Sequence, residues 1–148
     1  MGTSIAMHAA RRCDPLSEPV VLFEKAHLAA GSSGRSGAIL RQQYSDRELA
    51  GMARDSLRTY ASFYARTGRY IGFRRSGVLT LAGPSRPEFM ELLRRNVAMQ
   101  RSIGIEAELV DAPGIRRLVP GIRVDDGALG AWEPGAGFVD PVLTVEAF

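Results

Sequence analysis

The stretch from residue 20 to residue 44 constrains the fold more than any other part of this chain. Four apolar residues, Val20–Phe23, come directly before Glu24, and such a run is typical of a strand buried on both faces of a parallel sheet. A nucleotide-binding sheet places an acid at the end of such a strand, where it accepts hydrogen bonds from ribose hydroxyls. Residues 29–37 are rich in glycine and serine, which lets the backbone approach a ligand closely. The stretch therefore predicts a strand, an acid and a loop that wraps a ligand.

The residues before Glu24 extend this pattern. Gly2 lies 22 positions before Glu24, and about 20 residues separate the glycines from the acid in a dinucleotide-binding fold. Residues 3–12 are predicted to form a helix with an apolar face, and residues 14–19 a loop. The first strand and the first two glycines of the G-x-G-x-x-G motif do not occur in the sequence. We therefore expect an incomplete Rossmann-like unit.

The sequence after Tyr44 contains helix start signals. Ser45–Glu48 and Ser85–Glu88 read as capping boxes, in which a serine is followed three residues later by a glutamate. They are predicted to start helices that run to about Thr67, where Gly68 is a helix stop, and to about Ile103. Asp111 is predicted to cap a short helix. The first of these helices carries an apolar stripe that consists of Leu49, Met52, Ala53, Tyr60, Phe63 and Tyr64.

Strand patterns follow at residues 73–82, 105–110 and 128–132, and a further helix start at residues 140–141. Helices and strands alternate along the chain, and the later strands have one polar face. The predicted fold class is therefore α/β, with an α+β second part that combines helices and a mixed sheet.

Four short segments, in this order, resemble a known family: residues 2–6, 21–25, 31–41 and 76–81. They are similar to the amino-terminal third of the FAD-dependent amine and amino-acid oxidoreductases. This group includes sarcosine oxidase, glycine oxidase, dimethylglycine dehydrogenase and D-amino-acid oxidase. The resemblance covers nearly all 148 residues and implies an amino-terminal fragment of such an enzyme. The domains expected from it are a partial FAD-binding domain, a partial substrate domain and the start of a helix that returns to the first, at residues 1–72, 73–140 and 141–148.

The resemblance also implies a cofactor site for FAD. Glu24 is expected to bind the adenosine ribose, and the amides after Gly2 to face the pyrophosphate. Arg41 resembles an arginine near the flavin in sarcosine oxidase relatives and is the one catalytic candidate, with a surface arginine as the alternative. Some members of the family tether FAD through a histidine in this loop, and no histidine stands at Gly34 or Arg35. The residues expected to hold the cofactor are Gly2, Glu24, Lys25, Gly31, Ser32, Ser33, Ala38, Ile39 and Leu40.

The implied reaction is oxidation of a carbon–nitrogen bond in a secondary or tertiary amine or an amino acid. In the family, a hydride equivalent passes to flavin N5 and the imine product hydrolyses. Three alternatives stay open at the level of sequence. The chain can be part of a related flavoenzyme for a hydroxy acid or glycerol phosphate, a non-catalytic Arg-rich binding module, or a fragment without activity of its own. The sequence does not identify the electron acceptor.

Composition excludes other classes of function. The net charge is +3, and 18 of the 19 basic residues are arginines scattered along the chain, which argues against a nucleic-acid surface. No apolar run approaches the ~18 residues that span a membrane. His8 and His27 lie far apart, and Cys13 is the only cysteine, so we expect no metal site. A single cysteine fits a reducing compartment, and we expect a cytoplasmic protein.

Overall fold

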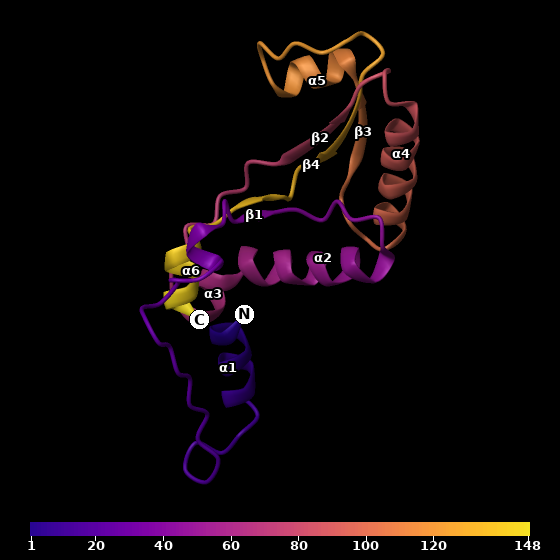
Figure 1. Ribbon diagram of the computed structural model, residues 1–148. Coiled ribbons are helices and arrows are strands. Elements are labelled where there is room, and N and C mark those ends of the chain that lie inside the picture. Colours follow the sequence, from indigo (N-terminus) through magenta and orange to yellow (C-terminus); the bar gives the residue numbers. More distant parts are fainter.

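The computed structural model describes residues 1–148 as helices and short strands arranged above and below the long helix α2 (Figure 1). None of the helices combines the length and the apolar character needed to cross a membrane. Along the chain the elements are α1 (Gly2–Ala10), the 3₁₀ helix η1 (Ser33–Arg35), β1 (Ile39–Leu40), α2 (Arg47–Ala61), α3 (Phe63–Thr67), β2 (Val78–Ala82), α4 (Pro87–Ser102), β3 (Glu108–Asp111), α5 (Ala112–Leu118), β4 (Leu129–Glu133), β5 (Gly137–Phe138) and α6 (Pro141–Ala147).

A three-stranded antiparallel sheet in the order β2-β4-β3 forms the part above α2 in Figure 1. Thr80 of β2 and Leu109 of β3 both pair with Ala131 of the central strand β4. Helix α4 contacts all three strands, and α5 contacts β3 and β4. Leu93 and Val97 of α4 are both 1% exposed and join Ala131 in the main hydrophobic cluster. Each such fully buried side chain stabilises the fold by about 1.5–3 kcal/mol.

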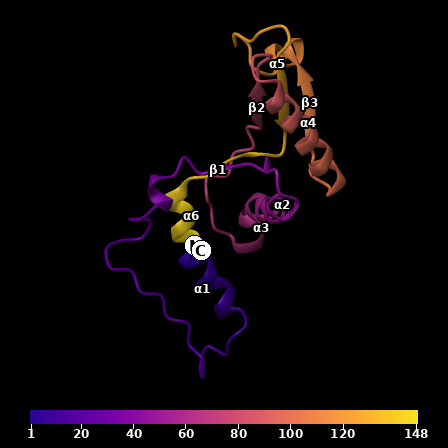
Figure 2. The ribbon, with the colours of Figure 1, turned by 45° about the vertical axis from the view of Figure 1, so that its right-hand side comes forward.

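A second, smaller sheet connects the segments below the first one. Strands β1 and β5 pair antiparallel, with Leu40 opposite Gly137. Arg74 extends this pairing, because its backbone exchanges hydrogen bonds of 2.9 and 3.1 Å with Phe138. Helix α6 then contacts η1, and Figures 1 and 2 both place the two chain ends side by side next to α6. The buried side chains of the second hydrophobic cluster are Phe63, Ile71 and Val139.

The predicted strand at Val20–Glu24 does not form, and this prediction is wrong. The segment is extended but belongs to no strand, and residues 20–25 make no backbone–backbone hydrogen bond. Val21 is 64% exposed and Phe23 89%. A strand is stable only where a neighbouring strand satisfies its N–H and C=O groups, and no strand of the described chain lies beside this segment.

The long predicted helix after Tyr44 is split and begins one residue later than its capping box suggests. Asp46, not Ser45, caps α2, and its carboxylate accepts the backbone N–H of Leu49 at 2.8 Å. The helix ends at Ala61, and both the N–H and the hydroxyl of Ser62 donate to the carbonyl of Arg58, at 3.1 and 2.8 Å. The five-residue helix α3 follows.

The second predicted capping box is also wrong, whereas two other helix signals are confirmed. Arg86 is the cap residue of α4 and makes no side-chain capping bond. Its N–H donates to the carbonyl of Gly83 at 3.0 Å, and this turn leaves Ser85 one position too early to cap. Asp111 caps α5 as predicted, with a hydrogen bond of 2.9 Å to the N–H three residues on. Gly68 ends α3 in the left-handed conformation, with φ of 69°.

The apolar stripe predicted along α2 is correct only in part. Helix α4 contacts α2, so only the face of α2 that contains Ala50 is fully covered. The buried positions on α2 and α3 are Ala50, Leu57 and Phe63, whereas the exposed fractions of Leu49, Met52 and Tyr64 are 51%, 66% and 65%.

Two predicted strands are shorter than expected for local reasons. The strand predicted at residues 73–82 begins only at Val78, because Gly77 turns the chain with φ of 71°. The strand predicted at residues 105–110 begins at Glu108. The Arg101 side chain donates a hydrogen bond of 2.7 Å to the carbonyl of Ala107, so this carbonyl is not available for pairing with a neighbouring strand. The strand predicted at residues 128–132 is confirmed within one residue as β4.

The tight contact at Gly137 yields a stability prediction. A Cβ at this position would overlap the backbone carbonyl of Arg74, which cannot move without breaking the pairing with Phe138. We expect Gly137→Ala to lower the free energy of unfolding by about 1–3 kcal/mol. Gly51→Ala is the matched control: an added Cβ meets no atom within 4 Å in α2, so the change should stabilise by up to about 1 kcal/mol. Urea unfolding followed by circular dichroism measures the free energy of unfolding of both variants. Equal effects of the two substitutions would show that Gly137 has no special steric role.

Candidate functional site

The amino-terminal end of α1 carries backbone donors without partners. No side chain caps this helix. The first N–H bonded within the helix is that of Ile5, which donates to the carbonyl of Met1 at 3.0 Å. The N–H groups of Gly2, Thr3 and Ser4 therefore stay free, as at any uncapped helix start. With the partial positive charge of the helix dipole, they suit an anion such as a phosphate.

The loop between residues 29 and 38 holds a strained backbone against this helix end. Ala29 and Ala38 have positive φ angles of 63° and 46°, each of which costs on the order of 1–3 kcal/mol for a residue with a side chain. The surroundings enforce both conformations. The carbonyl of Ala29 accepts the N–H of Gly34 at 3.2 Å, and Ala38 donates to Ser36 Oγ at 2.9 Å and accepts from Val139 at 3.2 Å. Strained loops of this kind cluster at ligand sites.

Two adjacent cavities, of about 220 and 350 Å³, lie between α1, this loop and α6. We call them together the α1–α6 cleft. They share the lining residues Met1, Thr3, Ser33 and Val145. Together they fall in the size range of small-molecule sites, about 300–1,000 Å³.

The cleft brings together most of the residues predicted from the sequence. Lys25 and Ser32 are exposed and do not line it. The predicted cofactor residues that do line it are Gly2, Glu24, Gly31 and Ser33 in the smaller cavity, and Ser33, Ala38, Ile39 and Leu40 in the larger one.

Three of the segments that line the cleft supply the polar side chains of Glu24, Ser33, Ser36 and Tyr60. Glu24 accepts the N–H of Ala26 at 2.9 Å, and this turn holds its exposed carboxylate at the smaller cavity. Ser33 and Ser36 add hydroxyls from the loop. Burial raises the pKa of the Tyr60 phenol, so this hydroxyl stays protonated and able to donate.

Sequence reasoning missed the contribution of α2 and α6 to this cleft. The sequence places Tyr60 only in the predicted apolar stripe, yet it is half-buried and lines the larger cavity. Thr144 and Val145 line the cleft from α6. The helix start at Asp140–Pro141 is the one sequence signal for the contribution of α6. In the structure this helix contacts η1 and therefore faces the loop that contains η1.

Arg41, the catalytic candidate, lies outside the α1–α6 cleft. Its guanidinium lies over the ring of Tyr44, 5.6 Å from the ring centre, which is a cation–π contact. Both residues line a separate groove of about 190 Å³ against Leu57 of α2. The structure therefore separates Arg41 from most of the predicted cofactor residues, although Ile39 and Leu40 line both the groove and the cleft.

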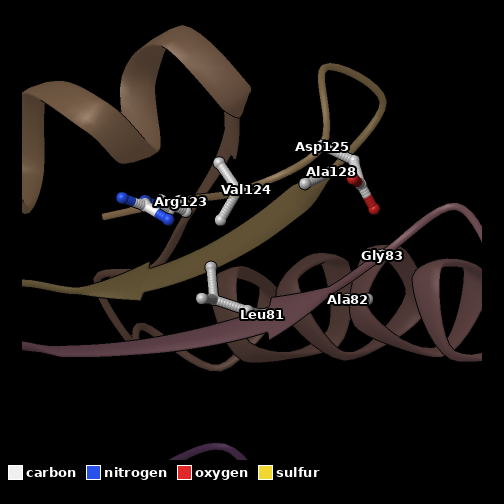
Figure 3. Close-up of a pocket in the computed structure, with 7 residues that line it drawn as sticks. All are labelled: Leu81, Ala82, Gly83, Arg123, Val124, Asp125 and Ala128. Carbon is white, nitrogen blue, oxygen red and sulfur yellow. The ribbon is translucent and has the colours of Figure 1, made fainter. Parts of the chain in front are cut away.

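A further cavity of about 360 Å³ lies at the far end of the three-stranded sheet (Figure 3). Leu81 and Val124 point toward one another across it, with Arg123 and Asp125 at its two ends. None of the cofactor-binding or catalytic residues predicted from the sequence lines this cavity.

The residues of the α1–α6 cleft fit a dinucleotide. The free N–H groups of α1 suit a pyrophosphate, and the carboxylate of Glu24 at one end suits the hydroxyls of a ribose. Ala38, Ile39 and Leu40 at the other end present small or aliphatic side chains that suit a flat ring.

Two mitochondrial proteins are similar to this chain in sequence. Mitochondrial dimethylglycine dehydrogenase of Rattus norvegicus is 27% identical over 141 residues, which are 95% of this chain and 16% of that protein. The mitochondrial pyruvate dehydrogenase phosphatase regulatory subunit of Mus musculus is 29% identical over 126 residues, which are 85% of this chain and 14% of that protein. The chain thus spans less than a fifth of these relatives.

Among solved structures, L-proline dehydrogenase from P. horikoshii matches with a TM-score of 0.84 at 25% identity. The match covers 98% of this chain and 37% of that protein. The sequence model of the family described as FAD dependent oxidoreductase matches residues 1–148. A match over the whole chain, together with the shared fold, shows that this protein belongs to the FAD-dependent oxidoreductase family.

Proposed function

We propose that this chain supplies the FAD-binding cleft of an oxidoreductase that acts on amines or amino acids. The observation that carries the proposal is the gathering of Gly2, Glu24, Gly31 and Ser33, with Ala38–Leu40, around one cleft. These residues lie up to 38 positions apart in sequence. This convergence supports a shared role for residues that were assigned to FAD from the sequence alone.

Each part of the cleft has a role in this proposal. Glu24 accepts hydrogen bonds from the adenosine ribose, and the N–H groups of Thr3 and Ser4 bind the pyrophosphate. Ser33 donates to the chain between the phosphates and the ring, and Ala38–Leu40 allow close approach of the ring. Ser32 and Lys25 stay proposed ligands, although both lie outside the cleft as described.

The proposed reaction converts the carbon–nitrogen single bond of the substrate to an imine. When bound, FAD supplies the two-electron acceptor for this step. The substrate loses a hydride equivalent and a proton, and water then hydrolyses the imine to an amine and a carbonyl compound. The names of two similar proteins, dimethylglycine dehydrogenase and L-proline dehydrogenase, support an amine or amino acid as substrate. Arg41 stays the proposed catalytic candidate, in its groove beside the cleft.

The proposed division into three parts is the one that the family resemblance implies. Residues 1–72 supply most of the cleft, residues 73–140 contain the three-stranded sheet, and residues 141–148 return to the first part. The contact between α6 and η1 supports the return of the last segment. The cytoplasmic location also stays a prediction of the sequence, since the mitochondrial names belong to the relatives.

A non-catalytic role is the second candidate. The similarity to a phosphatase regulatory subunit favours it, because that protein is named for regulation and not for oxidation. The two candidates differ in one observable: only the catalytic one requires that bound FAD lose its visible absorbance when dimethylglycine or L-proline is added.

Titration with FAD tests the proposed cleft. We expect a dissociation constant above about 1 μM for the 148-residue chain, because Val21 and Phe23 beside Glu24 are exposed and leave the adenosine end open. Shifts of backbone NMR signals on adding FAD should map to Thr3, Ser33 and Leu40. The proposal is wrong if these signals stay unchanged at millimolar FAD.

Glu24→Ala should weaken FAD binding by about 1–3 kcal/mol, the cost of losing hydrogen bonds to a charged group. Glu18→Ala is the matched control, because Glu18 is an exposed acid of the preceding loop that lines neither cavity. The same NMR titration gives both dissociation constants. Equal constants for wild type and Glu24→Ala would remove Glu24 from the site.

A further inference from the structure

A buried polar junction lies where the segment after β1 meets the end of β4. Glu133, the last residue of β4, is 1% exposed, and its Oε2 accepts the backbone N–H of Gln42 at 2.7 Å. Gln100 of α4 is 0% exposed, and its Nε2 donates to the backbone carbonyl of Gln42 at 2.9 Å. The peptide groups on both sides of Gln42 are thus fixed by side chains that come from two other elements.

This junction determines where β1 lies. At one end of the segment, the carbonyl of Ala38 accepts the N–H of Val139 at 3.2 Å. At the other end, Gln42 is fixed by Glu133, and Leu40 pairs with Gly137 between them. A strand of only two residues has few bonds of its own to set its position. The wall of the α1–α6 cleft and the backbone of Arg41 therefore depend on these anchors.

We propose that Glu133 is a positioning residue, which fixes the segment from Ala38 to Arg41 through the backbone N–H of Gln42. The functional importance of this positioning rests on the proposed function, because that function places the flavin ring beside Ala38–Leu40. The geometric part of the inference stands without FAD. Glu133 itself lines neither cavity of the cleft and acts only through the segment.

The surroundings of Glu133 favour its neutral form. Burial raises the pKa of this carboxyl, and the hydrogen bonds from Gln42 and Gln100 and the charge of Arg41 act in the opposite direction. The other groups of the junction on α4 and on the segment are neutral amides. Three buried amide atoms have no hydrogen-bond partner: the acceptors Gln43 Oε1 and Gln100 Oε1, and the donor Gln43 Nε2. A protonated carboxyl adds a donor to this junction, whereas a carboxylate adds only acceptors.

Two variants separate positioning from simple packing. Glu133→Gln keeps the shape and an oxygen that accepts the Gln42 N–H, whereas Glu133→Leu fills similar space without any acceptor. If Glu133 only filled volume, leucine would replace it. Glu106→Leu serves as the control, because Glu106 is an exposed acid in the segment before β3.

Hydrogen–deuterium exchange of the Gln42 amide is the direct readout, with the buried Val97 amide as the reference for global stability. We expect Glu133→Leu to speed exchange at Gln42 about tenfold or more relative to Val97, because the amide loses its buried acceptor. Glu133→Gln and Glu106→Leu should stay within about threefold of wild type by the same argument. Equal protection of Gln42 in wild type and Glu133→Leu would overturn the proposal.

A pH titration of the wild-type protein gives a second readout that needs no variant to fold. The Gln42 amide signal should shift with a single ionisation whose pKa lies above the usual 4.5 of a glutamate. A raised pKa in the folded state means that the folded protein binds more protons than the unfolded chain between these two pKa values. The stabilising contribution of neutral Glu133 is therefore full below about 4.5 and is lost as the pH rises through the folded pKa.

Comparing unfolding free energies of wild type and Glu133→Gln from pH 4 to pH 8 tests this sign. The wild-type protein should lose stability relative to the variant as the pH rises. A Gln42 signal that does not change over this range, or a difference of the opposite sign, would show that burial does not raise the pKa of Glu133, and the exchange experiment alone would then decide its positioning role.

The link to the cofactor is tested by FAD titration of the same variants. We expect Glu133→Leu to weaken FAD binding about tenfold and Glu133→Gln to leave it unchanged. If wild type binds no FAD, the proposed function fails while the exchange data still decide the role of Glu133. If wild type binds FAD and both variants match it, the link from Glu133 to the cleft is wrong and the proposed function stands.

Discussion

The backbone contact at Gly137 holds the lower part of this protein together. There, β5 pairs with β1 on one side and meets the Arg74 backbone on the other, with no room for a side chain. This contact brings the loop that ends at Ala38 next to the residues that start α6. The strained loop and α6 line the larger cavity of the cleft from these two sides. The candidate site is thus a result of one close approach between segments far apart in sequence.

Local signals in the sequence predicted the parts of the fold that depend on near neighbours. Asp111 and Asp140 cap their helices because each side chain reaches an N–H within three residues. Gly68 ends α3 for an equally local reason, its positive φ. The strand at Val20–Glu24 failed because its stability depends on a neighbouring strand, which no local pattern reports.

The residues of the candidate site likewise fall into two groups, those that the sequence could predict and those that it could not. Gly2, Glu24 and the glycine-rich loop could be chosen from spacing, because the chemistry of a nucleotide requires these residue types in this order. Tyr60 and Thr144 could not, because their places in the cleft follow from where α6 packs in the fold. The pairing of Glu133 with Gln42 joins residues 91 positions apart, and a sequence of ordinary length and composition gives no signal for such a contact.

The long-range pairing of β1 with β5 has a consequence for the order of folding. Helices α2 and α4 rely on contacts within a few turns and can form early, whereas closing a chain loop of 91 residues between Gln42 and Glu133 carries a large entropic cost. Pairings of this kind form late, after the helices and the three-stranded sheet provide a surface for them. We therefore expect the cleft to be the last part of the chain to be assembled, so that a chain arrested before that step would contain native helices but not the candidate site.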